Sequence, residues 1–95
     1  MSSPSIDARA LAQAGFEALR NDDPHKARAA FERIEAGGEA DAAVCAALAC
    51  ACRDLNDKAA ALAAADRALA LEPRNLRALL LKDDHPRIRI AAAAA

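Results

Sequence analysis

Apolar and small residues recur every three or four positions along most of this chain, which is the spacing of one face of a helix. Polar residues that favour helix ends interrupt the pattern at intervals. The pattern predicts full helices near 5–20, 24–36, 40–54 and 57–71, followed by a short fifth helix near 75–82. Nothing in residues 1–82 alternates as a half-buried strand does, so we expect an all-α fold.

The predicted helix boundaries rest on capping residues. Ser3 or Ser5 is suited to begin the first helix, and Asp23 followed by proline is suited to begin the second. Gly37-Gly38 is a typical helix terminator. The remaining starts are expected near Glu39–Asp41, at Asn56-Asp57 and at Asn75. The turns inside each helix pair are short, so the two paired helices should lie antiparallel.

Residues 8–41 and 42–75 carry one pattern twice, with a period of 34 residues. The matched pairs are Leu11 and Cys45, Gly15 and Ala49, Asp23 and Asp57, Ala27 and Ala61, and Asp41 and Asn75. Small residues at fixed places allow two helices to cross closely. We therefore expect Gly15 to lie at a helix crossing where a leucine would be destabilising.

A pair of helices repeating every 34 residues resembles the tetratricopeptide repeat. Residues 58–75, KAAALAAADRALALEPRN, are similar to the second helix of such a repeat and its exit turn. The resemblance covers about residues 8–82. It implies antiparallel helix hairpins stacked as a short right-handed solenoid, with two repeats and one capping helix in a domain of residues 1–82. Residues 83–95 are expected to be a disordered tail.

The chain also departs from that family pattern. Leu11, Ala18, Cys45 and Cys52 stand where the family has tryptophan or tyrosine, and Glu39 stands in place of a proline. The third repeat fails after Leu81, because charged residues and a proline follow.

The resemblance implies a protein–protein interaction scaffold rather than an enzyme, without a cofactor. In the family the first helix of each repeat lines a concave groove. The corresponding residues here are Arg9, Ala12, Phe16, Leu19, Arg20, Ala43, Ala46, Cys50, Arg53, Arg77 and Leu80. They predict a small apolar groove with an arginine rim, suited to a protein or peptide partner such as an amphipathic helix. A degenerate surface without a partner is an equal alternative.

One class of family ligand is disfavoured. Members that capture C-terminal carboxylates use lysine, asparagine and arginine at set groove positions. Of the matching residues here, Ala12, Phe16, Ala47, Arg77 and Leu81, only Arg77 fits.

A second resemblance suggests an alternative function. The segments QAGFEALRNDDPHKARAAFERI and ALALEPRNLRALLLK are similar to the N-terminal repeat region of bacterial aspartyl/asparaginyl β-hydroxylase-like proteins. The chain would then be the non-catalytic module of a larger enzyme. Its iron site would need two histidines and a carboxylate. Only His25 and His85 are present, so the catalytic domain would lie beyond residue 95.

Composition and charge further limit the kinds of protein that this chain could be. The hydrophobic fraction is 55%, but nearly a third of the residues are alanine, so the core should be thin. A net charge of −1 lacks the basic footprint of a nucleic-acid-binding protein. The apolar runs are broken by charge and too short to span a membrane. Because no signal peptide is recognisable, we expect a cytoplasmic protein.

Three groups of residues could suggest chemistry but have simpler explanations. Cys45 and Cys52 fall on the buried stripe and Cys50 points elsewhere, so we expect reduced thiols and no metal. His25 lies in the first turn of a helix beside ordinary capping aspartates. Gly37-Gly38 lacks the lysine and strand of a phosphate loop.

The end of the predicted solenoid carries three consecutive leucines, Leu79, Leu80 and Leu81. Three successive helical residues span about 200° of the surface, so one neighbouring helix cannot cover them all. We expect Leu79 to face inward and Leu80 or Leu81 to remain exposed. This end should then dock on the tail, on a second copy of the chain or on a missing domain. The tail, with its PRIRI segment, is either disordered or able to add as a strand to a partner's sheet.

Overall fold

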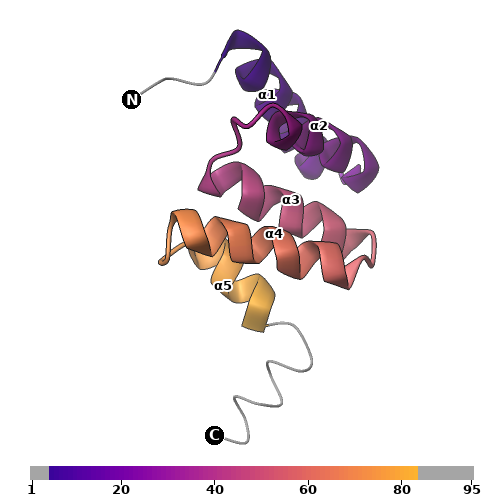
Figure 1. Ribbon diagram of the computed structural model, residues 1–95. Coiled ribbons are helices and arrows are strands. Elements are labelled where there is room, and N and C mark those ends of the chain that lie inside the picture. Colours follow the sequence, from indigo (N-terminus) through magenta and orange to yellow (C-terminus); the bar gives the residue numbers. More distant parts are fainter. Residues whose placement is uncertain (1–4, 84–95) are drawn as a thin grey trace, which may run out of the picture.

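The computed structural model describes residues 5–83, and these residues form five helices and no strand (Figure 1). The helices are α1 (Ile6–Arg20), α2 (Pro24–Ala36), α3 (Ala42–Asp54), α4 (Lys58–Leu71) and α5 (Leu76–Asp83). The predicted all-α fold is confirmed for the described part of the chain. Each predicted helix is present, and the largest boundary difference is at the start of α3. The disorder expected for the tail falls on residues outside the described range, apart from Asp83, which ends α5.

Each helix begins at a side chain that accepts a hydrogen bond from the backbone N–H three residues later. The caps are Ser5, Asp23, Asp41, Asp57 and Asn75. The distances lie between 2.8 and 3.2 Å. Each cap satisfies one donor that the helix itself leaves unpaired, which is typically worth about 1 kcal/mol.

The turns inside the two helix pairs have the same backbone geometry, 34 residues apart. Asp22 and Asn56 adopt left-handed conformations with φ of 59° and 64°. The N–H of the next residue, Asp23 or Asp57, returns to a carbonyl five positions earlier, at 2.8 and 2.9 Å. Aspartate and asparagine tolerate this conformation better than other non-glycine residues. The sequence repeat therefore corresponds to a repeat in the backbone.

Each helix packs against the next one in the chain, and the helices form two layers: α1, α3 and α5 in one, and α2 and α4 in the other. α1 contacts α2, α2 contacts α3, α3 contacts α4, and α4 contacts α5. In addition, α3 touches both α1 and α5, whereas α2 and α4 make no comparably close backbone contact. Figure 1 shows α3 at the centre of this arrangement, between the α1–α2 pair and α5. The layer of α1, α3 and α5 is thus the more closely spaced of the two.

The core is built largely of alanine around a single phenylalanine. Phe31 is 0% exposed, and it and Cys52 are the largest fully buried side chains of the described residues. α1 passes directly over the Phe31 ring at Gly15, where an added Cβ would lie 2.6 Å from both Cε1 and Cζ. The close helix crossing predicted at Gly15 is present, and Phe31 is the group that requires it.

Glu39, which stands where the repeat pattern has a proline, has a structural role of its own. The backbone N–H and the hydroxyl of Ser5 donate to the Glu39 carboxylate, at 3.2 and 2.7 Å. This carboxylate ties the start of α1 to the loop between α2 and α3. A negative charge at that place also interacts favourably with the N-terminal end of the helix dipole.

The orientation predicted for α5 is wrong at one residue. Leu79 was expected to face inward, but it is 43% exposed, and Ala78 and Leu81 are buried instead. The reason is that α5 packs against both α3 and α4, and the small Ala78 lets it approach them closely. Leu80, at 63% exposure, follows the expectation that this end leaves a leucine uncovered.

Candidate partner-binding surface

The residues predicted to line a groove all belong to α1, α3 and α5, the closely spaced layer. Exposed members are Arg9, Arg20, Ala43, Arg53, Arg77 and Leu80. Half-buried members are Ala12, Phe16, Leu19 and Cys50. Ala46 is 1% exposed, which corrects the prediction that it lines the surface. It is covered because α3 lies between α1 and α5 and buries most of its circumference.

The apolar part of this surface is anchored to the core. The Phe16 ring meets the Phe31 ring edge to face, with centroids 5.1 Å apart and an interplanar angle of 69°. Leu19, Ala12 and Cys50 also pack against buried residues while part of each side chain stays accessible. Side chains that are held in this way lose little conformational freedom on binding, which favours association.

Two arginines from different helices lie near the Cys50 thiol. Burial raises the pKa of Cys50, and the positive charges of Arg77 on α5 and Arg53 on α3 lower it by smaller amounts. Arg53 also forms an ion pair with Asp54 at 3.5 Å. The Cys50 thiol is therefore neutral at pH 7, and the arginines that act on it are Arg53 of its own helix and Arg77 of α5.

Ion pairs between helices occur on the opposite layer. Arg67 of α4 contacts Glu35 of α2 at 2.7 Å, and Arg28 of α2 contacts Asp57 at the start of α4 at 3.2 Å. The Glu35 Oε2 atom is itself buried, and the Arg67 guanidinium 2.7 Å away supplies the opposite charge. These pairs bridge α2 and α4, which are too far apart for their backbones to touch.

A depression of about 340 Å³ is lined in part by the Glu35–Arg67 bridge, and none of the sequence patterns predicts it. Its lining consists of Glu35, Gly38, Ala40, Cys45, Arg67, Ala70 and Leu71. None of the predicted groove residues contributes to it. Its one sequence signal is Cys45, which is much smaller than its counterpart Leu11 in the first repeat and leaves space between α2 and α4.

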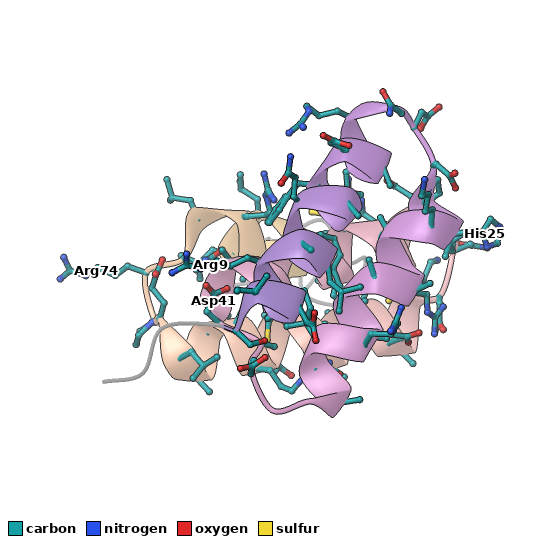
Figure 2. All side chains as sticks on the ribbon, turned by 90° about the horizontal axis from the view of Figure 1, so that it is seen from above. Arg9, His25, Asp41 and Arg74 are labelled. Atoms are coloured by element: carbon teal, nitrogen blue, oxygen red, sulfur yellow. The ribbon has the colours of Figure 1, made fainter. Side chains whose placement is uncertain are left out.

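The structure gives simple roles to the residues considered for chemistry. Asp23 caps α2, and His25 points away from the helices (Figure 2). Cys45 and Cys52 are each 2% exposed, and burial raises the pKa of both thiols. Among residues 5–83, no three histidine, cysteine, aspartate or glutamate side chains are grouped so that they could hold a metal ion. Within the same residues, no helix combines the length and apolar character needed to cross a membrane.

In comparisons with known proteins, no family model, no curated protein and no solved structure matches this chain.

Proposed function

We propose that the chain is a protein-interaction module of the tetratricopeptide type, which binds a helical segment of a partner protein on the surface of α1, α3 and α5. The observation that carries this proposal is the 34-residue recurrence of the turn geometry at Asp22 and Asn56. Helix pairs that repeat with this period stack side by side, and such stacks commonly bind partners along one layer.

The spacing of the helices supports the choice of layer. A stack of helix pairs curves toward the side on which the helices are closer together, and here that side is α1, α3 and α5. This surface also offers half-buried apolar side chains at Phe16, Leu19 and Cys50. Held apolar groups with a polar rim are the usual form of a surface that receives an amphipathic helix.

Selection from a displayed library of helical peptides would test the proposal. Binders of the wild-type chain are expected to lose affinity about tenfold or more for Phe16→Asp, because a carboxylate would replace the central apolar contact. Leu71→Asp is the matched control, since Leu71 is exposed on α4 at the rim of the depression. Binders that respond to Leu71→Asp and ignore Phe16→Asp would place binding on the opposite layer and refute the proposal.

A further inference from the structure

α5 carries most of the exposed large apolar side chains of residues 5–83. Leu76, Leu79 and Leu80 are 74%, 43% and 63% exposed, respectively. At 100° per residue, these three leucines lie within about 100° of one another on the helix surface. The buried Ala78 and Leu81 fall on the opposite side. α5 is therefore apolar on two sides, and the described residues cover only one of them.

The two complete helix pairs show which element is missing over this face. α1 is covered by α2 and α3 by α4, and α5 is the counterpart of α1 and α3 in the 34-residue repeat. The residues equivalent to Leu79 are Leu11, which is half-buried, and Cys45, which is 2% exposed. Figure 1 shows α5 at the end of the stack, and among residues 5–83 no second helix lies over it. The uncovered face is thus the place of a helix arranged as α2 and α4 are.

The side of α4 next to this place is apolar as well. On α2, the residues that reach across to the following second helix are Arg28 and Glu35, both through ion pairs. Their counterparts 34 residues later on α4 are Leu62 and Leu69, which are half-buried. A helix in the uncovered place would therefore meet leucines where α4 meets charged residues of α2.

The charges near these leucines are already matched. Asp66, which lies between Leu62 and Leu69 on α4, pairs with Lys82 of α5 at 2.8 Å. The place therefore calls for an apolar helix and not for a charged one. We call this surface the end face, and its members are Leu62, Leu69, Leu76, Leu79 and Leu80.

We infer that a second copy of the chain covers the end face, in a two-fold dimer in which α5 of each copy takes the place of the missing second helix of the other. The α5 of a second copy supplies the apolar side that this place requires. Its length also fits, because residues 76–80 span only about 6 Å along the axis and an eight-residue helix spans about 12 Å. The dimer continues the packing of α1 with α2 and of α3 with α4 to a third pair, built from two chains. A two-fold contact covers both end faces at once.

The size of the end face determines how strong the dimer is. α5 has 8 residues and lies beside α4, so the face measures on the order of 12 by 20 Å. A stable interface buries about 800 Å² per partner, which is more than this face offers. The dimer should therefore be weak and reversible, with a dissociation constant on the order of 100 μM.

Sedimentation equilibrium of the full chain, from about 10 μM to 1 mM, tests for this dimer. Monomer and dimer are expected without larger species, because a two-fold contact is closed. Leu79→Asp should weaken the association about tenfold or more, since the symmetry places the new carboxylate in the contact twice. Leu71→Asp is the matched control and should leave the association unchanged, because Leu71 is 60% exposed on α4 but lines the depression beside α2.

Methyl NMR of the unmodified chain locates the contact without any substitution. The resonances of Leu62, Leu69 and Leu79 should shift together as the dimer forms. Those of Leu11 and Leu19, on α1 at the other end of the stack, should stay in place. Shifts on α4 as well as on α5 are expected only if the second copy lies in the place of the missing helix.

The dimer contact does not require the proposed partner-binding surface. Leu80 is the one residue that both include. Phe16→Asp should remove peptide binding and leave the dimer unchanged, whereas Leu79→Asp should weaken the dimer and leave the dependence of peptide binding on Phe16 unchanged. The two proposals can therefore fail separately.

Three results would overturn the inferred dimer. Association that shifts Leu19 but not Leu69 would place the contact on the layer of α1, α3 and α5. Species that keep growing with concentration would mean an open-ended contact instead of a two-fold one. A chain that stays monomeric at every concentration would exclude the second copy, and contacts from the Leu79 methyl groups to Ile88 or Ile90 would then assign the end face to residues 84–95.

Discussion

Gly15 offers the sharpest test of how α1 and α2 are held together. Gly15→Ala adds one methyl group, and its carbon would lie 2.6 Å from the Cε1 and Cζ atoms of Phe31. The ring cannot retreat easily, because Phe31 is fully buried and the Phe16 ring packs against it 5.1 Å away between centroids. The contact must therefore be relieved by shifting α1 away from α2.

Two effects of the substitution oppose each other. Replacing glycine by alanine within a helix normally stabilises it by roughly 0.5–1 kcal/mol. Overpacking a well-packed core costs about 1–3 kcal/mol. We expect the overpacking to be larger, so Gly15→Ala should lower the free energy of unfolding by about 1–2 kcal/mol, and Gly15→Leu by several kcal/mol.

Urea unfolding followed by circular dichroism measures these changes in the free energy of unfolding. Repeating the substitution in a Phe31→Leu variant shows whether the ring causes the loss. With Phe31→Leu the ring is absent, so Gly15→Ala should become neutral or stabilising by up to about 1 kcal/mol. Gly37→Ala is the control, because its added carbon would meet only ordinary contacts, at 3.5 Å or more. If Gly15→Ala stabilises the wild type as much as the Phe31→Leu background, the crossing does not depend on the ring.

Three further predictions concern the cysteines and the open end. Cys45→Leu should fill part of the space between α2 and α4 and raise the free energy of unfolding by about 1 kcal/mol in the same urea assay. Folding raises the pKa of the Cys45 and Cys52 thiols above the ordinary 9.0, so these thiols ionise at lower pH in the unfolded chain than in the folded one. The free energy of unfolding should therefore keep their full contribution below pH 9 and fall as the pH rises further. A Cys45→Ala, Cys52→Ala double variant should lack this part of the decline in melting temperature. Leu76 and Leu80 are exposed on α5, and light scattering should show concentration-dependent association that Leu76→Asp with Leu80→Asp abolishes; a wild-type chain that stays monomeric at all concentrations would contradict this.

The helices could be predicted from the sequence because their signals are local. Asp23 can be recognised as a helix cap from the residues within one turn of it, because its side chain bonds to the N–H three residues later, and the same holds for Asp57 in the second repeat. The crossing at Gly15 could be predicted because a second copy of the pattern, at Ala49, marks the position as one that must be small. The two repeats can be compared position by position within one chain, which shows that both equivalent positions are small.

The predictions that failed depend on contacts between helices. The orientation of α5 follows from Ala78, whose size matters only because α3 and α4 both lie against it. Ala46 fits the register of the surface, but the neighbours of α3 cover it. The depression at Cys45 arises from a missing volume between α2 and α4, and a volume of this kind has no local sequence signal beyond one undersized side chain.

The two helix pairs differ in what holds them, and this difference bears on binding. The fully buried residues of α2 include Phe31 and Ile34, whereas those of α4 are all alanines, with Leu69 partly buried beside them. A buried alanine contributes about one methyl group, so α4 gains much less from burial than α2. The ion pairs that reach α4 from Arg28 and Glu35 are partly exposed and add little. The end of the stack that carries Arg77 is thus the less stable one, and a partner seated across α1, α3 and α5 would stabilise it by linking it to the phenylalanine core.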